Sequence, residues 1–104
     1  MTRSELLAAV GDVGTMRALV ALLSDADIGY LMPNGSVSPS SLTWARGGPA
    51  EKTLTFALVA PGKIDVEYDD LTTGISDTDS FMVADAQAQA IVGQWFATYF
   101  ASDG

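Results

Sequence analysis

The chain of 104 residues contains no cysteine and no histidine. Without cysteine it forms no disulfide and offers no thiolate, which agrees with a reducing compartment. Without histidine it lacks the commonest general base and the usual zinc ligand, so any metal would need hard oxygen ligands. These two absences remove most of the familiar catalytic and metal-binding arrangements.

Basic residues are also missing from one part of the chain. From Ile64 to Gly104 there is no lysine or arginine, whereas residues 1–63 carry five acids and five bases, so the whole net charge of −8 arises after Lys63. The acids of that segment are Asp65, Glu67, Asp69, Asp70, Asp77, Asp79, Asp85 and Asp103. Such a field repels nucleic acid and anionic membranes and attracts a basic partner.

Long apolar runs are absent as well. The runs Leu6–Val10 and Ala18–Leu23 are far shorter than the ~20 residues that span a bilayer, and no signal-peptide pattern follows them. We therefore expect a cytoplasmic protein with no membrane contact. A hydrophobic content of 48% with 17% charged residues is typical of a globular chain, and the length predicts one domain over 1–104.

The apolar spacing predicts helices at both ends of the chain. A short helix is expected over Ser4–Val10, and a second helix carries Met16, Leu19, Val20 and Leu23 on one face. A long helix is expected from about Ala84 to Phe100. Its apolar stripe consists of Ala88, Ile91, Val92, Trp95, Phe96 and Tyr99, with Gln87, Gln89 and Gln94 outside it.

Alternating apolar and polar residues predict strands between these helices. The expected long strands are Ser41–Arg46, Thr53–Val59 and Ile64–Asp70, and shorter strands are expected over Ile28–Met32 and Phe81–Val83. The expected connections are a tight turn over Pro33–Ser36, a link at Gly47-Gly48-Pro49, a type II turn at Pro61-Gly62 and a polar loop over Leu71–Ser80. Short connections imply antiparallel neighbours. The predicted fold class is α+β, with N-terminal helices, a four- to five-stranded antiparallel meander and a long C-terminal helix packed on one sheet face.

The strand Ile64–Asp70 gives the clearest candidate site. Its acids Asp65, Glu67 and Asp69 share one face and stand about 6.8 Å apart, where like charges repel each other. One interpretation is a solvated strand whose charges block edge-to-edge pairing. The other is a docking surface for cationic side chains, or for a groove that normally holds phosphates. With the adjoining loop, the predicted partner-binding residues are Asp65, Glu67, Asp69, Asp70, Asp77 and Asp79.

Catalytic and metal-binding motifs are not found. Serines and threonines lack a histidine to activate them, and a Ser–Lys pair would have to use Lys52 or Lys63, which we expect in turns. Asp77-Thr78-Asp79 has the carboxylate spacing of a calcium loop but lacks the glycine and the glutamate that follow in such loops. We expect no enzyme activity, no cofactor and no metal.

Residues 53–101 resemble a known family. The strand ends in Val66-Glu67-Tyr68, and a glycine-containing polar loop, Phe81-Met82-Val83 and a helix bearing Ala90 and Phe96 follow. This order resembles the C-terminal half of small bacterial immunity proteins of polymorphic-toxin systems, particularly those paired with nucleic-acid deaminase toxins. The chain departs from the family pattern at Ala84, where a proline is common. The resemblance implies a small α+β protein that binds and blocks its cognate toxin in the cytoplasm.

The leading hypothesis is an inhibitor that docks its acidic strand and loop into a basic, nucleic-acid-acting protein. An immunity protein against a toxin is one form. A phage-encoded inhibitor of a bacterial defence nuclease such as a CRISPR complex, mimicking the charge of nucleic acid, is the other. A homo-oligomeric accessory domain and a small enzyme or ligand-binding domain remain as alternatives. The chain is expected to be a monomer or homodimer that does not itself bind nucleic acid.

Overall fold

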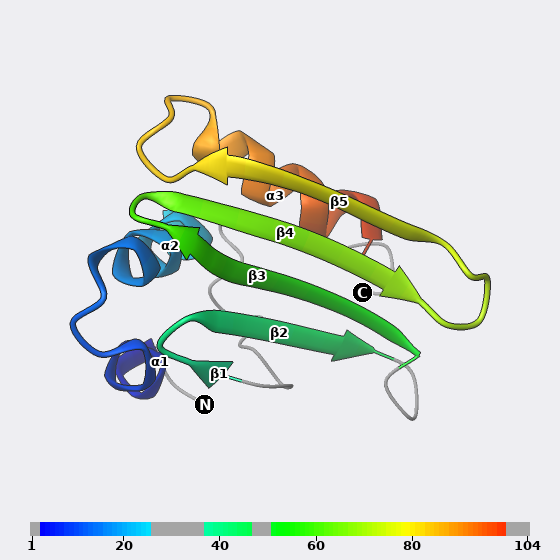
Figure 1. The fold of residues 1–104 in the computed structure, drawn as a ribbon, viewed down its shortest axis with the longest axis horizontal. Helices are drawn as coiled ribbons and strands as arrows, with labels where there is room; N and C mark the ends of the chain where they lie inside the picture. The colour runs from blue at the N-terminus through cyan, green and yellow to red at the C-terminus, as the bar shows by residue number, and fades with distance from the viewer. Residues whose placement is uncertain (1–2, 26–36, 47–50, 100–104) are drawn as a thin grey trace.

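The computed structural model describes residues 3–25, 37–46 and 51–99, which form three helices and one sheet (Figure 1). The elements run in the order α1 (Arg3–Val10), α2 (Gly14–Asp25), β1 (Val37–Ser38), β2 (Ser41–Arg46), β3 (Lys52–Ala60), β4 (Lys63–Asp70), β5 (Ser76–Met82) and α3 (Ala88–Tyr99). This arrangement confirms the predicted α+β class. The strand expected over 28–32, the turn over 33–36 and the Gly47-Gly48-Pro49 connection lie outside the described residues.

The five strands form one antiparallel meander in the order β1-β2-β3-β4-β5. Prediction placed β2 at its observed bounds and β3 and β4 to within one residue at each end. Lys52 and Lys63, expected in turns, are instead the first residues of β3 and β4. The β3–β4 turn also agrees, because Ala60 pairs with Lys63 and Gly62 has a φ of 79°, the positive value that the second central position of a type II turn requires. The amide of Gly62 donates to Thr15 Oγ1 at 2.8 Å, which ties this hairpin to α2.

The core lies between the sheet and the helices. Aromatic rings from both layers meet in it: Phe96 of α3 stacks on Phe56 of β3 with ring centroids 5.9 Å apart and contacts Trp44 of β2 edge-on at 5.0 Å. The other buried apolar residues are Leu6, Val10, Met16, Leu19, Val20, Leu23, Leu42, Leu54, Ile64, Val66, Tyr68, Phe81, Ala88, Val92 and Trp95. The buried residues alternate along β2, β3 and β4, so one face of the sheet packs against the helices.

The C-terminal helix begins later than predicted. It starts at Ala88 and not at Ala84, because Asp85 directs the chain into a turn first. The Asp85 carboxylate accepts a hydrogen bond from the Gln87 amide at 2.8 Å, and the Asp85 carbonyl accepts one from the Ala88 amide at 3.0 Å. Aspartate competes in this way with helical hydrogen bonding.

The predicted polar loop over Leu71–Ser80 is wrong in its second half. Residues 76–80 belong to β5, which pairs with β4 along its whole length. The turn that precedes it contains Gly74, whose φ is 75°. Five of the seven β5 residues are polar, and only Phe81 is buried, so the strand lacks the apolar alternation on which the prediction depended.

One face of the sheet is left open by the described elements. In Figure 1 helices α2 and α3 lie behind the sheet, and no described helix covers the face toward the viewer. The register places small and polar side chains on that face, in the central strands Thr43, Thr53, Thr55 and Ala57. This open face is where the candidate site lies.

Candidate partner-binding surface

Three carboxylates form a row along the open face of β4. Asp65, Glu67 and Asp69 alternate with the buried residues of the same strand, and Asp65 and Glu67 are exposed whereas Asp69 is half-buried. Their alternation follows from the two-residue period of a strand, which directs successive side chains to opposite faces. We call these three residues the acidic row. The structure brings them together as predicted.

The neighbouring strands place no cation opposite this row. On β3 the opposing residues are Ala57, Thr55 and Thr53, and on β5 they are Ser80, Thr78 and Ser76. Hydroxyl groups of Thr43 and Thr55 hydrogen-bond each other at 3.1 Å, so part of this polar surface is held by its own contacts. The acidic row is therefore bordered by small uncharged side chains on both sides.

The crowding of the row changes its protonation. A side-chain hydrogen bond with Asp69 and the negative charge of Asp69 raise the pKa of Glu67 above its ordinary value of 4.5, and the small loss of hydration adds to this. A neighbouring cation would have the opposite effect on the pKa, because it favours the ionised carboxylate. The sheet therefore holds these charges close together at a cost in free energy.

Asp70 has a different environment. Its side chain is only 6% exposed and accepts hydrogen bonds from the amides of Thr72 at 2.9 Å and Thr73 at 3.3 Å and from the hydroxyl of Tyr68 at 3.3 Å. Burial acts to raise the pKa of Asp70, but these hydrogen bonds outweigh it and lower the pKa below 3.8. The carboxylate thus fixes the β4–β5 turn and is turned away from the acidic row.

Asp77 and Asp79 lie on the helix side of the sheet. They pair with Tyr68 and Val66, whose side chains enter the core, and they line hollows between β5 and α3. The six predicted partner-binding residues are therefore divided. Three form the acidic row, two border α3, and Asp70 stabilises a turn.

Sequence reasoning missed the residues of α3 that accompany these two aspartates. Gln94 and Trp95 line both hollows. Trp95 belongs to the predicted apolar stripe and is buried, at 8% exposure. It lies at the border of the stripe, however, and also lines the groove between α3 and β5. The helical spacing alone could have indicated that border position.

The described residues contain no group of three or more histidine, cysteine, aspartate or glutamate side chains placed to hold a metal ion. Within the same ranges, no helix has the length and apolar character required to cross a membrane. No protein-family model matches the chain, and neither a curated protein nor a solved structure matches it.

Proposed function

We propose that this protein is a cytoplasmic inhibitor that binds a basic, nucleic-acid-acting protein through the acidic row. The row supplies charge to a binding site that otherwise accommodates phosphates. Complementary charge of this kind speeds encounter and fixes the register of the two surfaces.

The observation that carries the proposal is the row of three carboxylates on a sheet face that no described helix covers, with no cation opposite it on β3 or β5. Like charges on neighbouring positions destabilise a sheet, and a lysine in place of Thr55 or Thr78 would relieve them. A binding partner that supplies cations would remove this repulsion. Lysine and arginine side chains from a basic cleft would neutralise the row and lower the pKa of Glu67 again.

Two kinds of inhibitor use these same contacts. An immunity protein blocks a toxin made by the same cell or by a competitor, and the resemblance over residues 53–101 supports this form. A phage-encoded inhibitor of a defence nuclease is the second form and requires the same acidic surface. The nature of the captured partner distinguishes them.

The test compares the wild-type chain with a row variant that carries Asp65→Asn, Glu67→Gln and Asp69→Asn. Each protein is used to capture partners from a lysate of the native host, and the captured proteins are identified by mass spectrometry. A nucleic-acid-acting partner is then purified and its activity is measured with increasing amounts of either protein. We expect wild type to inhibit, and the row variant to bind about tenfold more weakly or worse.

A control variant separates local contacts from net charge. Asp12→Asn, Glu51→Gln and Asp85→Asn together remove the same number of charges from exposed positions outside the row. Inhibition by this control should remain close to wild type. The proposal is wrong if the row variant inhibits as well as wild type, or if the captured partner has no action on nucleic acid.

A further inference from the structure

We propose that the outer edge of β5 accepts an extended basic segment of the partner as an added strand, with a cationic side chain of that segment seated in the groove between β5 and α3. This inference rests on the proposed function and specifies how the partner is held. It involves residues outside the acidic row.

The hydrogen-bonding pattern shows which backbone groups β5 offers at its outer edge. β5 is the last strand of the sheet, and β4 is its one neighbour among the described strands. The amide of Asp70 donates to the Ile75 carbonyl, and the amide of Val83 donates to the Gly62 carbonyl, both at 2.8 Å. Odd-numbered residues of this segment therefore direct their backbone groups toward β4, since hydrogen bonding alternates along an antiparallel pair. The outward backbone groups belong to Ser76, Thr78, Ser80 and Met82.

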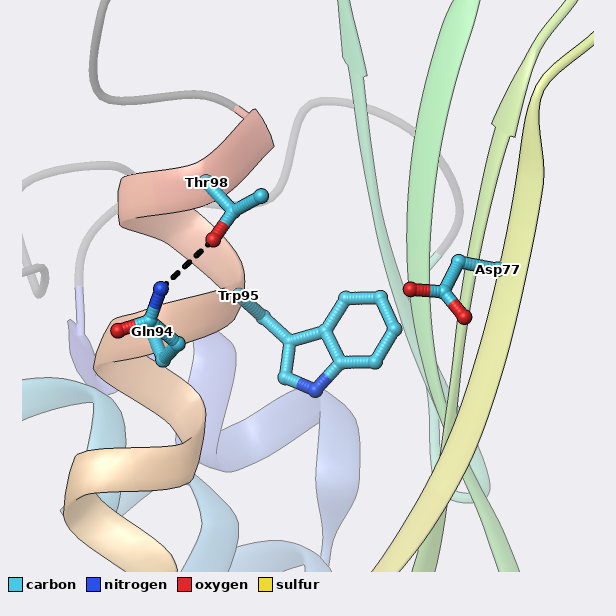
Figure 2. A pocket seen from close by; sticks show the side chains of 4 residues that line it. All are labelled: Asp77, Gln94, Trp95 and Thr98. Carbon is cyan, nitrogen blue, oxygen red and sulfur yellow. Dashed lines mark hydrogen bonds between the residues drawn. The ribbon is translucent and has the colours of Figure 1, made fainter.

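The side chains on the helix side of β5 form one wall of a groove. Figure 2 shows the carboxylate of Asp77 directed from the strand toward the indole of Trp95, with Gln94 and Thr98 on the helix beside it. A hollow of about 180 Å³ lies among these four residues, and a second hollow of about 380 Å³ that shares Gln94 and Trp95 extends past Asp79.

The chemistry of this groove suits a single long cationic side chain. The smaller hollow is well below the size of the usual drug-sized pocket. The aliphatic part of an arginine or lysine can lie along Trp95, while its charged end meets the carboxylates of Asp77 and Asp79. An added strand would direct every second side chain toward this groove.

Charge selects a basic strand over a second copy of this chain. Self-pairing through β5 would bring Asp77 and Asp79 of one copy against the same residues of another, and like charges opposed across strands are unfavourable. A basic strand meets the same aspartates as counter-ions. Charge therefore disfavours pairing of β5 with a second copy of this chain and favours pairing with a basic strand.

Asp79 also blocks one hydrogen-bond donor on the outer edge of β5. Its carboxylate accepts a hydrogen bond from the amide of Ser80 at 2.8 Å, so that one of the outward donors is already occupied. A lysine or arginine that pairs with Asp79 would draw the carboxylate away and release the Ser80 amide for the incoming strand. Cation binding and strand addition are thus coupled at one residue.

The experiment uses the full chain and a short synthetic peptide that alternates arginine and threonine. Binding is measured by calorimetry, and protection of the backbone amides of Ser76 and Thr78 is measured by hydrogen exchange. We expect binding with slower exchange at both amides. The same peptide with methylated backbone nitrogens keeps its charge but cannot donate strand hydrogen bonds, and we expect it to bind about tenfold more weakly. Equal binding of the two peptides would overturn the inference.

Variants of the chain give a second test. Thr78→Pro removes an outward amide and leaves the β4 ladder intact, a substitution that edge strands tolerate, and Thr78→Ala is its matched control. The double variant Asp77→Asn/Asp79→Asn is compared with the double variant Asp12→Asn/Glu51→Gln, which removes equal charge elsewhere. Peptide binding should fall about tenfold in Thr78→Pro and in the Asp77/Asp79 double variant, and it should stay near wild type in their two controls.

The same variants, tested against the captured partner, separate this inference from the proposed function. Loss of inhibition in both the row variant and the Thr78→Pro variant supports both. If inhibition is lost in the row variant but unchanged in Thr78→Pro and in the Asp77/Asp79 double variant, strand addition is wrong and the proposed function stands. If all of these variants inhibit like wild type, both are wrong.

Discussion

Glu67 and Asp69, two positions apart on β4, lie on the same open sheet face, and the carboxyl group of Asp69 raises the pKa of Glu67 by hydrogen bonding to its protonated form and by its negative charge. The folded state therefore holds the Glu67 proton more tightly than the unfolded chain does. At neutral pH, where both groups are charged, their repulsion lowers the free energy of unfolding.

The first prediction is that Glu67→Gln stabilises the free protein. Removing one charge from the row relieves repulsion at pH 7, and we expect a gain of a few tenths of a kcal/mol, which corresponds to a rise in Tm of about 1–3 °C for a domain of this size. The gain should vanish in acid. A carboxyl with a raised folded-state pKa contributes its stability below its unfolded pKa of 4.5 and loses it as pH rises through the folded pKa. Thermal unfolding of both proteins at pH 7 and near pH 3.5 tests this.

Thr55→Ala is a useful control for that experiment. It changes the position opposite Glu67 without changing any charge, so its effect on Tm should be the same at both pH values. A Glu67→Gln variant that is less stable than wild type at pH 7 would show that the row contributes to folding, and no partner would then be needed to account for the row.

The second prediction concerns Asp70. Its lowered pKa means that its contribution to stability is present above the unfolded value of 3.8 and is lost as pH falls through the folded pKa. Asp70→Ala leaves the amides of Thr72 and Thr73 without their acceptor, and we expect a fall in Tm on the order of 5–10 °C at pH 7. This deficit should shrink in acid, as Tm measured from pH 7 to pH 2 would show. A deficit that is constant over this range would contradict the assigned role.

The parts of the fold that could be predicted are those whose residues alternate or repeat around a core. Leu42 and Trp44 alternate with polar residues and give β2 its bounds, and the spacing of Val92, Trp95 and Phe96 identifies α3. β5 could not be predicted from the same signal. As an edge strand with both faces largely exposed, it is held by backbone hydrogen bonds to β4, which any polar sequence can make.

The candidate site was predictable only in part for the same reason. The positions of Asp65, Glu67 and Asp69 follow from the period of a strand that was correctly identified. The polar run over residues 71–80 predicts a loop for Asp77 and Asp79, so the sequence does not indicate on which side of the sheet they lie. Once β5 is known to pair in register with β4, their position opposite Tyr68 and Val66 follows directly.

The third prediction tests the β3–β4 turn. Gly62 has a positive φ, and a Cβ at this position would lie 3.4 Å from Met82 Cε. Gly62→Ala should therefore destabilise the protein by about 1–2 kcal/mol, because an L-residue pays a conformational penalty there. Gly14→Ala is the matched control: it begins α2 with open space around it and no positive φ, and its effect should be neutral or stabilising. Urea unfolding measures both, and equal effects of the two substitutions would rule out this explanation.

The fourth prediction is that partner binding depends on pH through Glu67. A cation that pairs with the acidic row favours the ionised form, so Glu67 must release its proton on binding, and affinity should fall as pH is lowered through its raised pKa. Asp70 does not titrate in this window because its pKa is lowered. The affinity of the captured partner for wild type and for Glu67→Gln is measured at several pH values between 7 and 4. We expect the affinity of wild type to fall more steeply with decreasing pH than the affinity of Glu67→Gln. The difference between the two slopes reports the proton that Glu67 must release on binding. Parallel slopes would show that the cation of the partner does not contact Glu67.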